Sequence, residues 1–193
     1  MTQLNFINKP IFEHGALKQI SEVLRSIGIK KPLICTDKGI VEIGMLNNLR
    51  SLLSNEFTPT IFDQTPANPT EEAVNIALQL FKTEDCDGII GLGGGSSIDL
   101  GKAVAIMATH EGSLVDFSLN EGGMEKIQET APLLAIPTTS GTGSEVSGGS
   151  VIIMHDGRKL ILASPQLVPD AAICDPDLTL QLPPLLTAGA GMD

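Results

Sequence analysis

Short aliphatic runs alternate along this chain with longer segments of helical period, and this alternation limits the possible folds more than any other feature. The runs indicate buried strands because they are rich in Ile, Leu and Ala and are bounded by polar or turn residues; they cover residues 32–37, 60–63, 87–92 and 133–137. Helical patterns follow at residues 70–80, with Thr70 as the N-cap, and at 96–108. Parallel strands need crossovers of this kind. The sequence therefore predicts an α/β fold, a parallel sheet with flanking helices.

The pattern changes after the fourth predicted strand. Residues 151–154 and 159–162 form two aliphatic runs separated by a segment that contains Asp-Gly, which is a strong hairpin turn signal. Residues 171–175 predict one more strand. A proline-punctuated connection then leads into a helix that begins near Leu185. We expect a hairpin in addition to the parallel sheet.

The glycine run Gly91-Leu92-Gly93-Gly94-Gly95-Ser96 lies between a predicted strand and a predicted helix. Free amide groups and the helix dipole attract an anion at such a place, and glycines let a phosphate approach the backbone closely. The run therefore predicts a phosphate-binding turn, although a triple glycine is equally typical of a turn needed only for packing. The strict dinucleotide fingerprint is not met because Ser96 stands in place of its third glycine. The P-loop motif is not met because Ala103 follows Lys102.

Polar residues also follow two other predicted strands. Residues 137–145, Pro-Thr-Thr-Ser-Gly-Thr-Gly-Ser-Glu, form a hydroxyl-rich loop that can bind phosphate, ribose or amide groups at the sheet edge, or can satisfy its own backbone. Asp37 ends the first predicted strand. Its carboxylate could accept hydrogen bonds from an adenosine ribose and repel a 2′-phosphate, or it could cap the next helix.

Charge and cysteine content exclude several classes of function. The chain has 12 Lys and Arg against 23 Asp and Glu, a formal net charge of −11, which disfavours nucleic acid as a partner. No apolar run approaches the roughly 20 residues that span a bilayer, and no signal peptide is evident. The 3 cysteines are widely spaced and predict no disulfide framework. The histidines lack metal-ligand spacing. We expect a cytoplasmic protein that binds neither nucleic acid nor a membrane.

Taken together, the motifs resemble the iron-containing (group III, metal-dependent) alcohol dehydrogenase family. The matching residues occur in order along the chain: Asn68-Pro69-Thr70, Cys86-Asp87-Gly88, residues 93–99 with Lys102, residues 135–139, residues 141–146, Asp175-Pro176, Leu182-Pro183-Pro184 and residues 187–193. The resemblance implies a Rossmann-like, dehydroquinate-synthase-like NAD-binding domain over residues 1–183. It also implies that residues 184–193 are the first turns of a truncated helical metal-binding domain, the remainder of which is absent from this sequence.

The resemblance also implies roles for individual residues. Asp37 would hold the adenosine ribose, Asn68 would line the cofactor groove, and the pyrophosphate would be cradled by Gly94, Gly95 and Ser96, with Asp99 supporting their loop. Thr138, Thr139 and Thr142 would flank the cofactor, Lys159 and Leu178 would contact its nicotinamide half, and Ser147 occupies a cofactor-site position where the family usually has threonine. Asp193 matches the first ligand of the family's divalent metal, iron or zinc, whose other ligands are histidines of the helical domain. No catalytic residue is assigned.

The implied activity is NAD-dependent oxidation of an alcohol to an aldehyde or ketone by hydride transfer, with NADP as a possible alternative cofactor and a homo-oligomer as the expected assembly. The 193-residue chain alone, with one metal ligand, is expected to bind NAD weakly and to be inactive. A catalytically inactive nucleotide-binding or dimerising module is an alternative, as is a related maleylacetate reductase or glycerol dehydrogenase. The Thr-Thr-Ser-Gly-Thr-Gly-Ser-Glu loop disfavours a sugar-phosphate cyclase.

Overall fold

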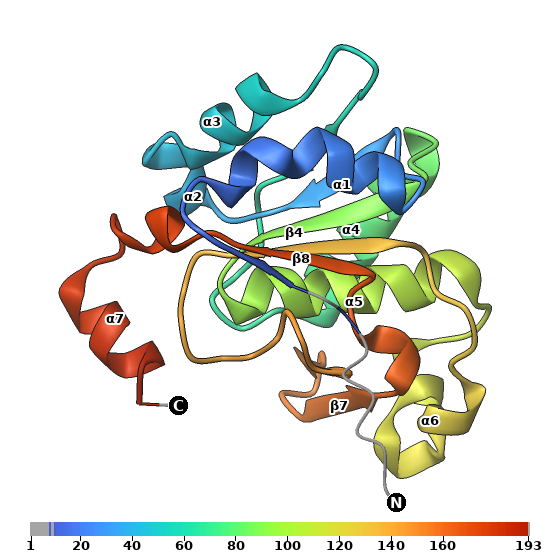
Figure 1. The fold of residues 1–193 in the computed structure, drawn as a ribbon. Coiled ribbons are helices and arrows are strands. Elements are labelled where there is room, and N and C mark those ends of the chain that lie inside the picture. Colours follow the sequence, from blue (N-terminus) through green and yellow to red (C-terminus); the bar gives the residue numbers. More distant parts are fainter. Residues whose placement is uncertain (1–7, 9, 193) are drawn as a thin grey trace, which may run out of the picture.

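The computed structural model describes residues 8 and 10–192, and within them a six-stranded sheet forms the centre of the molecule (Figure 1). All of its strand pairs are parallel. Across the sheet the strands run in the order β1 (Ile11–Phe12), β8 (Ala171–Cys174), β5 (Leu133–Pro137), β4 (Gly88–Gly93), β2 (Pro32–Cys35) and β3 (Thr60–Phe62). The predicted α/β fold with a mostly parallel sheet is confirmed.

The predicted hairpin is also confirmed and lies apart from the main sheet. Strands β6 (Gly149–Ile153) and β7 (Lys159–Ala163) pair antiparallel, with Val151 opposite Ile161. Gly157, in the turn, adopts a positive φ of 81° that favours glycine. Strand β6 of the hairpin packs on helix α5.

Helices cover both faces of the sheet. The α-helices are α1 (Ile20–Ser26), α2 (Lys38–Glu42), α3 (Met45–Leu52), α4 (Glu71–Thr83), α5 (Gly95–Thr109), α6 (Gly123–Lys126) and α7 (Pro184–Ala190). Short 3₁₀ segments are η1 (Ala16–Gln19), η2 (Leu114–Phe117), η3 (Leu119–Glu121), η4 (Pro165–Leu167) and η5 (Pro176–Thr179). Figure 1 shows α1 and α3 on one side of the sheet and α5 on the other. No helix in the described ranges has the length and apolar character that crossing a bilayer would require.

The core divides at the sheet because side chains of a strand alternate between its faces. In β2, Ile34 packs with α1 and α3, whereas its neighbours Leu33 and Cys35 pack with α4 and α5. The same alternation separates Ile89 from Ile90 in β4. Both faces are therefore dry, which is why these strands appear in the sequence as continuous apolar runs.

Helix α5 lies unusually close to the sheet because two glycines face each other. A Cβ on Gly91 of β4 would lie 3.0 Å from the Cα of Ile98, and a Cβ on Gly101 of α5 would lie 3.3 Å from the side chains of Ile89 and Leu133. These are tighter than ordinary contacts between carbon atoms, so side chains at these two positions would push the helix away from the sheet. The close approach fixes where the first turn of α5 begins.

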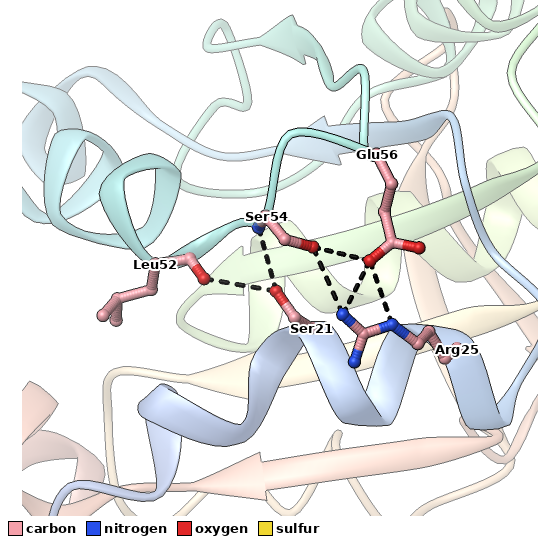
Figure 2. Close-up of polar contacts among 5 residues, drawn as sticks. All are labelled: Ser21, Arg25, Leu52, Ser54 and Glu56. Carbon is pink, nitrogen blue, oxygen red and sulfur yellow. Dashed lines mark hydrogen bonds and ion pairs between the residues drawn. The ribbon is translucent and has the colours of Figure 1, made fainter.

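Polar contacts tie α1 to the segment that follows α3 (Figure 2). The Arg25 Nε and Nη2 donate to Glu56 Oε1 at 3.0 and 2.6 Å, and the Ser54 hydroxyl donates to the same oxygen at 2.7 Å. Ser21 Oγ donates to the carbonyl of Leu52 at 3.2 Å and accepts from the amide of Ser54 at 3.1 Å. The hydrogen bond from Arg25 lowers the pKa of Glu56. The ion pair is exposed, so these contacts orient the segment more than they stabilise the fold.

Helix α7 lies at the periphery of the molecule (Figure 1), where Ala190 comes close to Gly141 and Leu186 lines the large cavity described below. None of its residues is buried, and Leu185 is 84% exposed. Pro184 occupies its first turn, where a missing amide hydrogen costs nothing. The helix predicted near Leu185 is confirmed. The proposed division of the chain at residues 183 and 184 stays a prediction.

Candidate functional site

The carboxyl ends of four parallel strands meet at one edge of the sheet and surround a cavity of about 870 Å³. The order in which strands are added across the sheet reverses there: β3 lies on one side of β2, whereas β4, β5 and β8 follow on the other side. Such a reversal leaves a crevice between the diverging connections, which is where open α/β sheets bind ligands. The residues that β2, β3, β4 and β5 contribute to the cavity include Asp37, Asp63, Thr65, Gly94, Ser96, Thr138 and Thr139.

The amino terminus of α5 lies at this edge and borders the cavity. Gly94 is the N-cap and provides no capping side chain, and the first amides of any helix have no acceptor within the helix. A Cβ on Gly94 would lie 3.4 Å from Thr139 Cγ2, and one on Gly95 would lie 3.2 Å from Thr142 Cβ. The glycines therefore allow the threonine loop to lie directly over the helix end. Backbone amides and the helix dipole make this an anion site.

Two threonine hydroxyls in the cavity wall have no hydrogen-bond partner in the described part of the chain. Thr65 Oγ1 and Thr139 Oγ1 are both buried and both residues line the cavity. A buried hydroxyl without a partner is unfavourable, and nearly all such groups in proteins are satisfied. A ligand with hydroxyl or phosphate oxygens would satisfy them, so the cavity fits a polar ligand such as a dinucleotide.

Asp37 caps the next helix, and it also lines the cavity, where its role toward a ribose stays a prediction. Its Oδ1 accepts from the amide of Ile40 at 3.1 Å and so caps α2. The residue also lines the cavity, and its Oδ2 would lie 3.4 Å from a Cβ placed on Gly93, beside the glycine turn. The cap leaves one carboxylate oxygen to face a ligand.

A second cavity of about 430 Å³ adjoins the other side of the α5 terminus and is bounded by the β6–β7 hairpin. Ser96 lines both cavities. Of the predicted site residues, Asp37, Gly94, Thr138, Thr139 and Leu178 line the first cavity, and Asn68, Gly95, Asp99, Thr142, Ser147 and Lys159 line the second. All twelve predicted site residues thus line the two cavities beside the α5 terminus. Leu178 and Lys159, which were both expected to contact the nicotinamide half, line different cavities.

A buried lysine, to which the sequence analysis gave no role, binds two residues that line the second cavity. Lys102 is fully buried, and its Nζ donates to the carbonyls of Ser147 and Gly149, each at 2.8 Å. Burial lowers the pKa of Lys102 to about 8, while the charge of Asp99 opposes that fall. The lysine thereby anchors the segment before β6 to α5. Its signal in the sequence was the Asp-x-x-Lys spacing, which puts both side chains on one face of the helix.

Asp99 completes this network from the preceding turn of α5. Its Oδ1 accepts from the Ser144 hydroxyl at 2.5 Å, and its Oδ2 accepts from the amide of Val151 at 3.0 Å. Burial raises the pKa of Asp99, and these hydrogen bonds counteract the rise. Asp99 and Lys102 together join the threonine loop and the hairpin to the helix that carries the anion site.

Comparison with known proteins identifies the family. The family model described as "Iron-containing alcohol dehydrogenase" matches residues 8–176. The chain belongs to this family. A 4-hydroxybutyrate dehydrogenase from Cupriavidus necator is 48% identical over 182 residues, which are 94% of this chain and 47% of that protein. The chain spans about half the length of the curated relatives it matches.

Solved structures of iron-containing alcohol dehydrogenase relatives share the fold. A 1,3-propanediol oxidoreductase superposes with a TM-score of 0.89 at 35% identity, over 95% of this chain and 48% of that one. A sulfoacetaldehyde reductase from Bifidobacterium kashiwanohense, solved in complex with NAD⁺, superposes with a TM-score of 0.85 at 29% identity, over 96% and 49% of the two chains. The predicted resemblance to the family's amino-terminal domain is confirmed.

The metal of the iron-containing family is not accounted for by the part of the chain described. Among residues 8 and 10–192, no group of three His, Cys, Asp or Glu is placed to hold a metal ion. Asp193, predicted as a ligand, lies outside the described residues. His14 lies on the surface, where its Nδ1 pairs with Asp177 Oδ1 at 2.7 Å, and this hydrogen bond raises the pKa of His14.

Proposed function

We propose that this chain is the dinucleotide-binding half of an NAD-dependent, metal-dependent alcohol dehydrogenase that converts small alcohols to aldehydes or ketones by hydride transfer. The observation that carries the proposal is the uncapped α5 terminus between two cavities, with buried threonine hydroxyls facing one of them. In the proposal, residues 1–183 form the NAD-binding domain and residues 184–193 begin a helical metal-binding domain.

The proposed placement of the cofactor follows from the helix terminus. The pyrophosphate lies against the amides of Gly94, Gly95 and Ser96, because these are the groups without partners inside the helix. The adenosine ribose then falls in the larger cavity, where Asp37 has one carboxylate oxygen facing the glycine turn. An acidic group there favours NAD over NADP because it repels a 2′-phosphate.

The nicotinamide half of the cofactor is proposed to lie in the smaller cavity. Asn68, Thr142, Ser147 and Lys159 line that cavity, and the Asp99 network positions its walls. Leu178 lines the larger cavity, so in this proposal it packs beside the adenosine half. When bound, the nicotinamide supplies the hydride acceptor, and the contribution of this chain is to bind and orient it.

Several parts of the proposal concern the whole enzyme. The substrate is a small alcohol or aldehyde, the metal is iron or zinc with Asp193 as one ligand, the assembly is a homo-oligomer and the compartment is the cytoplasm. The metal supplies Lewis-acid polarisation of the substrate oxygen when bound. Among the described residues, no group of three His, Cys, Asp or Glu could hold this metal.

A fluorescence titration with NADH tests the cofactor half directly. We expect saturable binding that NAD⁺ competes away and that Gly95→Val weakens more than about tenfold, because the added side chain would occupy the space beside Thr142. Gly189→Ala is the matched control, since no atom lies within 4 Å of its added Cβ. Absence of saturable binding by the unsubstituted chain at millimolar NADH, or equal binding by both variants, would contradict the proposal.

A further inference from the structure

The end of the larger cavity beyond Asp37 is built by the loop that follows β3. Strands β2 and β3 pair in parallel with Cys35 opposite Phe62. Beyond that pair, Thr36 N donates to the carbonyl of Phe62 at 2.9 Å, and Thr65 N donates to the carbonyl of Thr36 at 3.1 Å. These bonds hold the loop against the end of β2. Asp63 and Thr65 are thereby brought beside Asp37, and all three line the cavity.

The buried hydroxyl of Thr65 makes no hydrogen bond to the described part of the protein. The residue is only 7% exposed, and its hydroxyl has no partner in the ranges the structure describes. Thr36, the residue that directly follows β2, also has a buried hydroxyl without a partner in these ranges, but it does not line the cavity. Since a buried hydroxyl needs a hydrogen-bond partner, and Thr65 alone of the two borders the cavity, Thr65 is placed to bind a polar atom of a ligand.

Asp63 adds a second negative charge at the same end of the cavity. It is half-buried, and across the described residues its carboxylate is in no recorded hydrogen bond or ion pair. Asp37, by contrast, gives one oxygen to the α2 cap. Lys38 also borders the cavity, but its side chain is exposed. Two carboxylates near one ligand site accept hydrogen bonds from hydroxyl groups and repel phosphate.

We propose that Asp63 and Thr65 bind the adenosine ribose together with Asp37, and that Asp63 is a specificity-determining residue that disfavours a ribose with a 2′-phosphate. This inference rests on the proposed function, because it assumes that a dinucleotide occupies the cavity. It goes beyond that function by assigning discrimination to the loop after β3, which the sequence motifs do not include.

The test measures the dissociation constants of NAD⁺ and NADP⁺ by isothermal titration calorimetry. We expect Asp63→Asn to lower the ratio of the NADP⁺ dissociation constant to the NAD⁺ dissociation constant at least about tenfold, because the change removes the repulsion between the Asp63 carboxylate and the 2′-phosphate of NADP⁺. Asp63→Glu, which keeps the charge, should leave most of the preference. Glu72→Gln removes the same charge from an exposed position outside the cavity and should leave the ratio unchanged.

The hydroxyl of Thr65 is tested by the isosteric change Thr65→Val. We expect it to weaken binding of both dinucleotides about fivefold, the effect of losing one hydrogen bond. Thr36→Val is the matched control, since it removes a hydroxyl that is equally buried but lies outside the cavity, and it should leave both constants unchanged. Equal effects of the two changes would show that Thr65 acts through packing and would overturn its proposed role.

The outcomes separate this inference from the proposed function. If the unsubstituted chain binds neither dinucleotide, the proposed function and the inference fail together. If it binds NAD⁺ and Asp63→Asn keeps the original ratio, the inference is overturned and the proposed function stands. Melting temperatures check that each variant is folded, and Asp63→Ser replaces Asp63→Asn if the latter does not fold.

Discussion

The buried charge of Lys102 predicts a pH dependence of stability that can be worked out from the structure. Its pKa falls from 10.5 in the unfolded chain to about 8 in the folded protein, because burial disfavours the ammonium form. Each pKa unit corresponds to about 1.4 kcal/mol, so the fall amounts to about 3 kcal/mol. Between pH 8 and 10.5 the unfolded chain therefore binds more protons than the folded protein, and the free energy of unfolding rises with pH.

The assay compares the unsubstituted chain with Lys102→Met by urea denaturation at several pH values. From pH 8 to pH 10 we expect the unfolding free energy of the unsubstituted chain to rise by about 2 kcal/mol relative to that of Lys102→Met. Only the unsubstituted chain gains stability in this range, because only it carries Lys102. The cysteine thiols titrate in both proteins and cancel in the difference.

The lysine variant also has a cost that does not depend on pH. Removing Nζ takes its hydrogen bonds away from the carbonyls of Ser147 and Gly149, and each lost hydrogen bond costs about 1 kcal/mol. Lys82→Met makes the same chemical change on an exposed face of α4 and should show neither effect. If the difference in unfolding free energy between the Lys102 variant and the unsubstituted chain stays constant from pH 8 to pH 10, burial does not lower the pKa of Lys102 as described.

Three other predictions concern packing, capping and thiol reactivity. Gly123→Ala should lower the free energy of unfolding by about 2–4 kcal/mol in urea denaturation, because its Cβ would lie 2.0 Å from the carbonyl oxygen of Phe117; an unchanged midpoint would contradict this. Asp175→Asn should lower the free energy of unfolding by about 1–3 kcal/mol, because the two oxygens of this buried carboxylate accept from Gly15 N and Leu17 N, each at 3.0 Å, and the NH₂ group of Asn cannot accept; full stability would refute that role. Burial raises the pKa of Cys35, so its thiol should resist Ellman's reagent at pH 8 until urea unfolds the chain; fast labelling of the folded protein would count against its burial.

Much of the sheet was predictable because its strands are buried on both faces. Continuous apolar runs marked β2, β4 and β5, and the Asp-Gly signal marked the hairpin. Strand β1 was not predicted, since two residues carry no pattern of their own and become a strand only by pairing with β8, about 160 positions away. The short helices α1 to α3 were also not assigned, because their helicity depends on packing more than on propensity.

The site shows the same limit. The glycine turn and the threonine loop were recognisable because each follows a strand directly, and strand ends meet at one sheet edge. The role of Lys102 was not, because its partners lie 45 and 47 residues further along the chain. The position of Thr65 beside Asp37 likewise depends on the parallel pairing of β2 with β3, which a linear sequence does not state.

An NMR titration tests whether the amino terminus of α5 binds the diphosphate of a dinucleotide. The 193-residue chain, labelled with ¹⁵N, is titrated with NAD⁺ into the millimolar range while its amide resonances are recorded. We expect saturable shifts that are largest at the amides of Gly94, Gly95 and Ser96, with none at Gly189 in α7. Shifts that saturate elsewhere while these three amides stay unchanged, or no saturable shift at all, would contradict this binding.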